Sequence, residues 1–386
     1  MKALFPSLES AWRKLAYANQ GALRAAVPIL LPLSWIYGRL GRIRREGYRR
    51  GILPQASFPI PIFSVGNLTV GGVGKTPFTL FLAHRLQRLG RRPAILLRGY
   101  GRRSDRPALV HRDSLHKNSI RNSVQIYGDE PSLLAFLSDY PIAVSRRRID
   151  GVKLLRAESQ CDVILLDDGF QHLPLKRDRD IVLCDGKNPF GNGRCLPCGP
   201  LREPQRALYA AHAIVANEKP DHDALDSLNR FHLPVFIGGL QWLGFYPLSD
   251  WMKQQFDAPM PLNAFQRQSL VLVSGIGSPE RLHCQALSYG LSIHSRIQYP
   301  DHHWYTSEDL RQLTLHSRRR PILMTEKDAI RLLHHSEIPQ DLQANAFVIR
   351  AAWQMKNQDS FDQWLQNQAS FIEFPSDPVE SSPLSR

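Results

Sequence analysis

The chain has 386 residues, which is enough for two domains with separate cores. Its composition, 43% hydrophobic and 22% charged, excludes a disordered chain and a polytopic membrane protein. The net charge of +14 favours a polyanionic partner and leaves nucleic acid, anionic lipid and a phosphorylated substrate open. The five cysteines, an odd number, argue against a secreted disulfide framework and favour the reducing cytosol.

The N-terminal region combines an apolar run with a basic one. Residues 25–37 (AAVPILLPLSWIY) are almost wholly apolar, and arginines crowd residues 39–50. The apolar run is shorter than the roughly 20 residues that span a bilayer, and in a signal peptide the basic residues would precede it. We therefore expect residues 1–55 to form a helical segment at a membrane interface, with Trp35 and Tyr37 in lipid and arginines at anionic headgroups. The alternative is a helix buried against its own domain.

From residue 56 to residue 204, short apolar runs alternate with amphipathic stretches. The runs that predict strands are 59–65, 94–97, 142–145, 162–166 and 181–184, and the stretches that predict helices are 78–89, 131–137 and 149–158. Residues 102–125 are polar and basic, and we expect a surface loop there. The alternation predicts an α/β fold with a mainly parallel sheet covered by helices on both faces.

A second series of strands and helices follows the predicted hinge GPLREP at residues 199–204. Its predicted strands are 213–215, 235–237, 270–273 and 321–324, and its helices begin at Pro279 and Ser307. The resulting domain prediction is an interfacial segment 1–55, a first α/β domain 56–204, a smaller C-terminal α/β domain 205–372, and a tail 373–386. The tail is rich in proline and serine and is predicted to be disordered.

The strongest chemical signal is the glycine-rich segment TVGGVGKT between a predicted strand and a predicted helix. Its residues are Thr69, Val70, Gly71, Gly72, Val73, Gly74, Lys75 and Thr76. A phosphate site needs a loop with few side chains, so that backbone N–H groups can close around the oxygens. Lys75 would then reach the β- and γ-phosphates of a nucleotide, and the Thr76 hydroxyl would bind Mg²⁺. The first position is Thr69 instead of the usual glycine, but the context of strand, loop and helix is that of a P-loop.

Two aspartates end a predicted buried strand, DVILLDD. A P-loop nucleotide site needs a carboxylate at such a strand end to hold the magnesium ion and its waters. Because Asp167 and Asp168 alternate sides, one is expected to face the metal and the other the groups around it. The alternative is a strand that ends in a polar turn.

Two further clusters carry catalytic residue types, but composition alone favours a structural role for each. Asp129 and Glu130 lie in a GDEP segment at a predicted helix start, where capping is the ordinary explanation. Asp301 and His302 lie in a DHH segment, and a carboxylate paired with an imidazole can act as a base. A CxxC pair at residues 195–198 lacks a second pair of metal ligands and is interpreted as incidental.

Together these motifs resemble the tetraacyldisaccharide 4′-kinase family. The segments that carry the resemblance are 64–67 (SVGN), 71–77 (GGVGKTP), 98–102 (RGYGR), 128–131 (GDEP), 167–172 (DDGFQH), 199–204 (GPLREP), 275–279, 301–302 (DH) and 325–329 (TEKDA). They follow the family's order over roughly residues 20 to 350. DDGFQH followed by GPLREP is the most specific pair.

The resemblance implies a reaction and a set of residue roles. The γ-phosphate of ATP would move to the 4′-hydroxyl of a tetraacyldisaccharide 1-phosphate, giving lipid IVA. Asp129 and His302 match the family's catalytic pair, so Asp129 would accept the proton of the hydroxyl with His302 assisting it. Asp167, Asp168 and Glu130 would arrange the Mg²⁺ ion. The implied cofactors are ATP and Mg²⁺.

The implied partners are ATP, the acylated disaccharide 1-phosphate lipid and an anionic membrane surface, with no nucleic acid. The implied location is the cytoplasmic face of the bacterial inner membrane. The alternative is a membrane-recruited P-loop ATPase switch, but Val70 stands where that group carries a signature lysine. A GTPase would need a guanine-reading N-K-x-D segment, which the sequence lacks.

Overall fold

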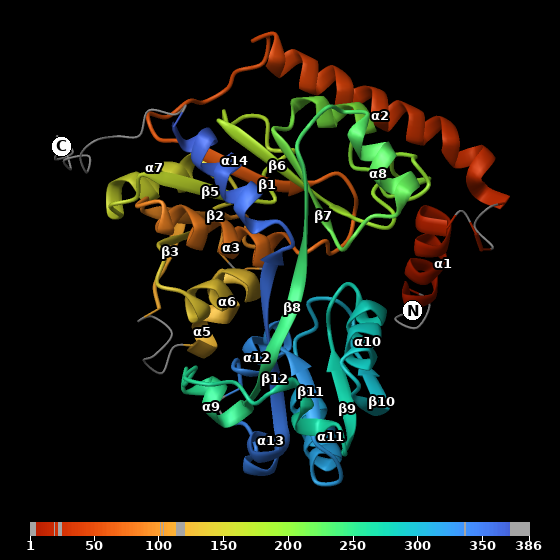
Figure 1. Cartoon of the computed structure of the whole chain (residues 1–386), viewed down its shortest axis with the longest axis vertical. Helices are drawn as coiled ribbons and strands as arrows, with labels where there is room; N and C mark the ends of the chain where they lie inside the picture. Colours follow the sequence, from red (N-terminus) through yellow and green to blue (C-terminus); the bar gives the residue numbers. More distant parts are fainter. Residues whose placement is uncertain are drawn as a thin grey trace. The chain divides into compact units, whose positions relative to one another are not determined.

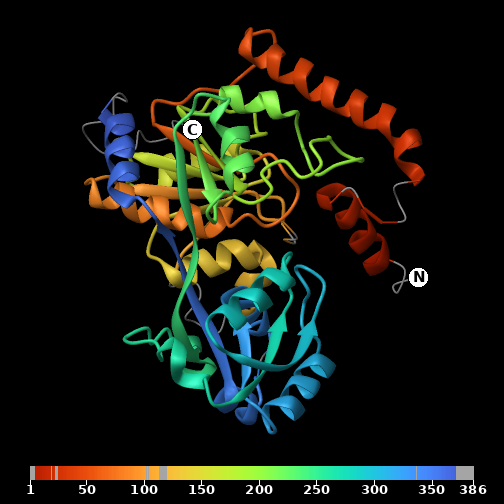
Figure 2. The ribbon, with the colours of Figure 1, turned by 45° about the vertical axis from the view of Figure 1, so that its right-hand side comes forward.

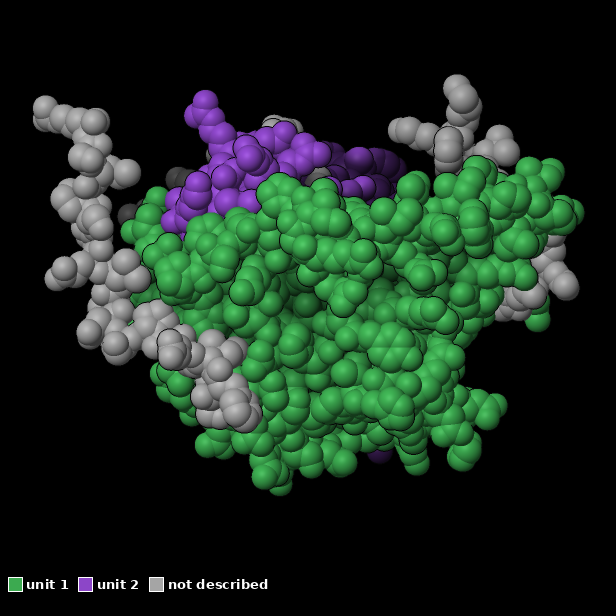
Figure 3. All heavy atoms as spheres, turned by 90° about the horizontal axis from the view of Figure 1, so that it is seen from above, with its two compact units in different colours: residues 1–96, 156–239, 353–386 green, residues 97–155, 240–352 purple. Residues whose placement is uncertain are grey.

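The computed structural model divides the chain into two compact units that interleave along the sequence. It describes residues 5–18, 20–21, 25–100, 102, 104–112, 120–335 and 337–370. Unit 1 comprises residues 1–96, 156–239 and 353–386, and unit 2 comprises residues 97–155 and 240–352 (Figure 3). This partition differs from the contiguous division predicted at residue 204, because distant stretches of chain supply neighbouring strands of one sheet. The predicted disordered tail lies outside the described residues.

Unit 1 is an α/β unit built on parallel strands (Figure 1). Its elements are α1 (Phe5–Ala18), α2 (Val27–Arg49), β1 (Ile62–Asn67), α3 (Lys75–Arg88), β5 (Val163–Asp167), β6 (Arg179–Asp185), the 3-10 helix η2 (Gln205–Ala210), β7 (Ala213–Asn217), α8 (His222–Asn229) and α14 (Gln358–Ser370). Four elements pass from one unit into the other: β2 (Pro93–Leu97), α7 (Arg148–Glu158), β8 (Val235–Pro247) and β12 (Ala346–Met355).

The sheet of unit 1 has the order β7-β6-β1-β5-β2, and every neighbouring pair is parallel. Strands β1, β2, β5 and β7 are buried along their whole length, as continuous apolar runs in a parallel sheet require. Helix α3 packs on α14 through Phe78 and Phe361 (Figures 1 and 2). The predicted α/β fold with mainly parallel strands is confirmed.

Helix α2 places its small residues inward and its large apolar residues outward. Ser34 and Gly38 are its buried residues, and the Ser34 hydroxyl donates to the carbonyl of Cys195 at 2.6 Å. The residues that we call the α2 apolar stripe are exposed and repeat at intervals of four and three residues: Ile29, Leu33, Ile36, Leu40 and Ile43. The N-terminal region is thus helical, as predicted. Among the described residues, no helix is long and apolar enough to cross a membrane.

Unit 2 is a second α/β unit. Its remaining elements are β3 (Ala108–Val110), α5 (Ile120–Tyr127), α6 (Asp129–Leu137), β4 (Ile142–Val144), α9 (Leu248–Met252), η3 (Leu262–Phe265), β9 (Ser269–Ser274), α10 (Pro279–Ser288), β10 (Ser292–Gln298), α11 (Ser307–Ser317), β11 (Ile322–Thr325), α12 (Glu326–Leu332) and α13 (Gln340–Asn345). Strands β10, β9, β11 and β12 are parallel neighbours in that order, and β3 pairs with β4 in the antiparallel sense.

One element prediction is wrong and two strands were not predicted. Residues 102–125, expected to form a surface loop, contain β3 and the start of α5. A strand of three residues is too short to show a period, which explains the miss. Strand β10 alternates polar and apolar residues between Gly290 and Pro300, a pattern that would have allowed its prediction, and β12 begins directly after the short helix α13.

Candidate active site

The glycine-rich loop between β1 and α3 is held in place by its neighbours in unit 1. Gly71 and Gly74 have φ values of 128° and 84°, which glycine adopts at little cost. The N–H of Val70 donates to the carbonyl of Pro200 at 2.8 Å. The side-chain amide of Asn217, at the end of β7, donates to the carbonyl of Val73 at 3.1 Å. These contacts hold the loop in a defined conformation, with Gly74 as the residue before the first turn of α3.

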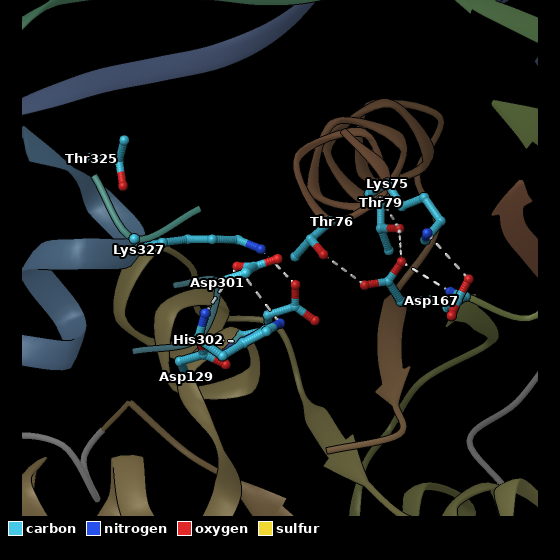
Figure 4. A network of polar contacts seen from close by, with 12 residues as sticks. Lys75, Thr76, Thr79, Asp129, Asp167, Asp301, His302, Thr325 and Lys327 are labelled. Atoms are coloured by element: carbon cyan, nitrogen blue, oxygen red, sulfur yellow. Dashed lines mark hydrogen bonds and ion pairs between the residues drawn. The ribbon is translucent and has the colours of Figure 1, made fainter. Parts of the chain in front are cut away.

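Asp167, the last residue of β5, receives two hydroxyl groups from α3. The Thr76 hydroxyl donates to Oδ2 at 2.9 Å and the Thr79 hydroxyl to Oδ1 at 3.2 Å (Figure 4). A hydroxyl oxygen beside a carboxylate is a donor set that suits Mg²⁺, which takes oxygen ligands and shares them with phosphates and water. The contact between Thr76 and Asp167 is compatible with the metal role predicted for them, which stays a prediction.

Asp168 belongs to a different set of contacts. It follows the strand with a φ of 52°, which turns it out of the β5 direction. Its Oδ1 lies 3.3 Å from Lys75 Nζ and 3.0 Å from Arg202 Nη1. Burial raises the pKa of Asp168, but the charges of Lys75 and Arg202 outweigh burial and leave that pKa below its usual value. Lys75 also donates to Oδ1 of Asn67 at 3.1 Å, so its ammonium group is fixed beside the loop.

The second cluster lies in unit 2 and joins two segments far apart in sequence. His302 Nδ1 lies 2.9 Å from Asp129 Oδ2, across a separation of 173 residues (Figure 4). Because an ionised carboxylate only accepts, Nδ1 carries the proton of this hydrogen bond. His302 has a φ of 59°, an uncommon conformation for a residue other than glycine, and its N–H donates to Asp301 Oδ1 at 3.0 Å.

Two cations of α12 contact the two carboxylates at the start of α6. Arg331 places both Nε and Nη2 at 2.7 Å from Asp129 Oδ2. Lys327 Nζ donates to Glu130 Oε1 at 2.6 Å. Glu130, predicted as a magnesium residue, is thus half of an ion pair.

The charges of this cluster shift the pKa values of the Asp129–His302 pair in opposite directions. Burial raises the pKa of Asp129, but the hydrogen bond from His302 and the charges of Arg331 and Lys327 outweigh it, so that pKa lies well below its usual range. The hydrogen bond to Asp129 raises the pKa of His302. Both residues are therefore stabilised in their charged forms.

The structure brings together some predicted residues and adds others. Asp129 contacts His302, and Thr76 contacts Asp167, whereas Asp168 and Glu130 pair with cations. Among the described residues, no three His, Cys, Asp or Glu side chains are arranged to hold a metal. The residues that were given no role from sequence are Asn67, Thr79, Arg202, Asn217 and Arg331. A single arginine inside the apolar run AIRLL was a signal for Arg331.

Comparisons with known proteins agree on one family. The sequence profile of the family described as Tetraacyldisaccharide-1-P 4′-kinase matches residues 26–370. The tetraacyldisaccharide 4′-kinase of Methylobacillus flagellatus is 37% identical over 309 residues, covering 79% of this chain and 83% of that protein. The one from Nitrosococcus oceani is 35% identical over 320 residues, covering 81% and 86%. The crystal structure of LpxK from Aquifex aeolicus, an "apo" form in complex with ATP, is 28% identical with a TM-score of 0.68, and the match covers 88% of this chain and 98% of that one.

Proposed function

The chain belongs to the tetraacyldisaccharide-1-P 4′-kinase family, and on this premise we propose how its side chains carry out the reaction. The reaction is the transfer of the γ-phosphate of ATP to the 4′-hydroxyl of a tetraacyldisaccharide 1-phosphate in lipid A biosynthesis. The contact that carries the proposal is the 2.9 Å hydrogen bond between His302 and Asp129 in unit 2. Through this bond, side chains from two polar segments that lie far apart in sequence form one charged pair.

The proposed nucleotide site is the loop 69–76, within the region 56–204 assigned from sequence to nucleotide binding. The backbone N–H groups of this loop other than that of Val70 would face phosphate oxygens, and Lys75 would neutralise charge on the β- and γ-phosphates. Thr76 and Asp167 are the proposed magnesium ligands, directly or through water, and Thr79 orients the carboxylate of Asp167. When bound, Mg²⁺ would neutralise part of the phosphate charge. The ATP in the Aquifex aeolicus structure supports ATP as the nucleotide.

The two oxygens of Asp129 have different proposed roles. Oδ2 is occupied by His302 and by two nitrogens of Arg331. Oδ1 accepts the backbone N–H of Glu130 at 2.9 Å, and its second lone pair can receive the proton of the acceptor hydroxyl. In a loose phosphoryl-transfer transition state the hydroxyl loses its proton as its bond to phosphorus forms, so a carboxylate of low pKa is an adequate acceptor.

The proposed location is the cytoplasmic face of the inner membrane, with α2 at the lipid surface. The α2 apolar stripe is exposed to solvent, and Arg39, Arg42 and Arg44 on the same helix are also exposed. Apolar side chains entering lipid beside arginines at anionic headgroups describe an interfacial helix. This arrangement would keep the acyl chains of the substrate in the membrane during the reaction.

A direct assay tests the proposed function. The protein in detergent is incubated with γ-labelled ATP, Mg²⁺ and the tetraacyldisaccharide 1-phosphate, and label in the lipid is measured. We expect Asp129→Asn to lower kcat by at least ~100-fold. The matched control is Asp139→Asn in the same unit, an exposed carboxylate paired with Arg112, which should label lipid at the native rate. Folded protein that hydrolyses ATP but labels no lipid would favour the ATPase switch instead.

A further inference from the structure

The segment TEKDA, residues 325–329, ends β11 and opens α12, and the proposed reaction assigns it no role. Helix α12 packs on α6, the helix that begins with Asp129 and Glu130. Lys327 and Arg331 are four residues apart on α12, so they lie on the same face of the helix. Each contacts one of the two adjacent carboxylates of α6, at 2.6 Å for Glu130 and 2.7 Å for Asp129.

The guanidinium of Arg331 is itself fixed by a buried set of hydrogen bonds. Its Nη1 donates to the carbonyl of Gly275 and lies 3.7 Å from Asp328 Oδ1. Asp328 in turn accepts from the N–H of Gly275 at 2.8 Å, from the Tyr305 hydroxyl at 2.9 Å and from the Thr325 hydroxyl at 2.6 Å. With three donors on its two oxygens, the Asp328 carboxylate has little freedom to move.

These contacts leave one defined position for the Asp129 carboxylate. Arg331 applies two nitrogens to the single oxygen Oδ2, and His302 donates to the same oxygen. Turning the carboxylate out of this orientation would break all three contacts. The arrangement therefore fixes the direction in which the remaining oxygen of Asp129 presents its lone pair.

We propose that Arg331 and Lys327 are positioning residues that orient the Asp129–Glu130 pair, and that Asp328, held by Tyr305 and Thr325, fixes Arg331. The inference rests on the proposed role of Asp129 as proton acceptor. Positioning residues act on the rate of the chemical step, because a displacement of about 1 Å can cost roughly 100-fold in rate. In this inference Lys327 and Arg331 act through Glu130 and Asp129, so we expect the KM values for ATP and for the lipid to change little.

Two conservative variants test this inference. Arg331→Lys keeps the charge but removes the planar guanidinium, whose Nε and Nη2 both contact one oxygen of Asp129. We expect kcat to fall by about 100-fold. Tyr305→Phe removes one hydroxyl from Asp328, and we expect kcat to fall by about tenfold. In both variants the KM for ATP and for the lipid should stay within about twofold, because substrate binding that is equal in the ground state and the transition state is unaffected. The matched control is Tyr246→Phe, which removes another buried hydroxyl of unit 2, donated to the carbonyl of Phe256 at 3.0 Å. This control should keep the native kcat.

A double-mutant cycle separates this inference from the proposed role of Asp129. If Arg331 acts through Asp129, adding Arg331→Lys to Asp129→Asn should cause no further loss of kcat. An Arg331→Lys variant with native kcat, or losses that multiply in the double variant, would overturn the positioning role and leave Asp129 as the proton acceptor. Native kcat in Asp129→Asn would overturn the proton acceptor itself. Equal losses of kcat in Tyr305→Phe and Tyr246→Phe would show that these hydrogen bonds contribute only to general stability. That result would also overturn the inference.

Discussion

The α2 apolar stripe gives a quantitative prediction for membrane binding. Its side chains Ile29, Leu33, Ile36, Leu40 and Ile43 are 77%, 54%, 47%, 60% and 61% exposed. The perturbation is the triple substitution Leu33→Ala, Ile36→Ala and Leu40→Ala. Full burial of a leucine or isoleucine is worth about 1.5–3 kcal/mol, and roughly half of each side chain is exposed, so entry into lipid gives about 1 kcal/mol per residue. The three losses together, about 3 kcal/mol, lower the partition coefficient by about 100-fold.

The assay for this prediction is sedimentation with vesicles of phosphatidylcholine and phosphatidylglycerol. Alanine favours helix, so α2 should persist in the triple variant, and circular dichroism checks this. The matched control is Leu287→Ala with Leu315→Ala, two exposed leucines of unit 2, 51% and 44% exposed, that should leave binding unchanged. Triple-variant binding within about twofold of the native protein would refute the reasoning, since it would place the lipid contact elsewhere.

Three further predictions concern the two clusters. Thr76→Ala should lower kcat roughly 10–100-fold at fixed Mg²⁺, and Thr76→Ser, which keeps the hydroxyl, should restore most of it in the labelling assay. NMR titration should give His302 a pKa above 6.5, and Asp129→Asn should lower it. Because the folded-state pKa of His302 is raised, its protonation stabilises the protein fully below about pH 6.5 while Asp129 is ionised, and chemical denaturation should show that contribution lost as pH rises through the folded value. Gly74→Ala would place a Cβ 2.7 Å from the Trp353 ring at a φ of 84°, so unfolding should become easier by about 1–3 kcal/mol, measured in urea.

The part of the site that is local in sequence could be predicted, and the part that is not local could not. The loop 69–76 and the strand that ends in Asp167 carry their chemistry in consecutive residues, and the structure places Thr76 against Asp167. The sequence could not say which aspartate faces Thr76, because the choice depends on where β5 ends. Asp129 and His302 meet across 173 residues, and composition alone favoured a structural role for both. Only the resemblance to a known family joined them.

The fold shows the same division between local and distant information. Buried parallel strands such as β1 and β5 form continuous apolar runs and were predicted within a few residues. The interleaved units were not, since the chain crosses between them inside β2, α7, β8 and β12 and not in loops of distinctive composition. A boundary inside a regular element leaves no proline, glycine or charge signal to read.

Stability alone does not explain the charged residues that unit 2 encloses. Buried ion pairs contribute little to folding, because removing both charges from water costs about as much as their attraction gains. Unit 2 nevertheless encloses Arg331 with Asp129 and Asp328, whose side chains are 1%, 7% and 0% exposed. Packed apolar residues of the same volume would stabilise this region at least as well, but they could not hold one oxygen of Asp129 in place. The charges therefore serve geometry, and replacing the whole set by apolar residues should lower kcat more than it lowers the melting temperature.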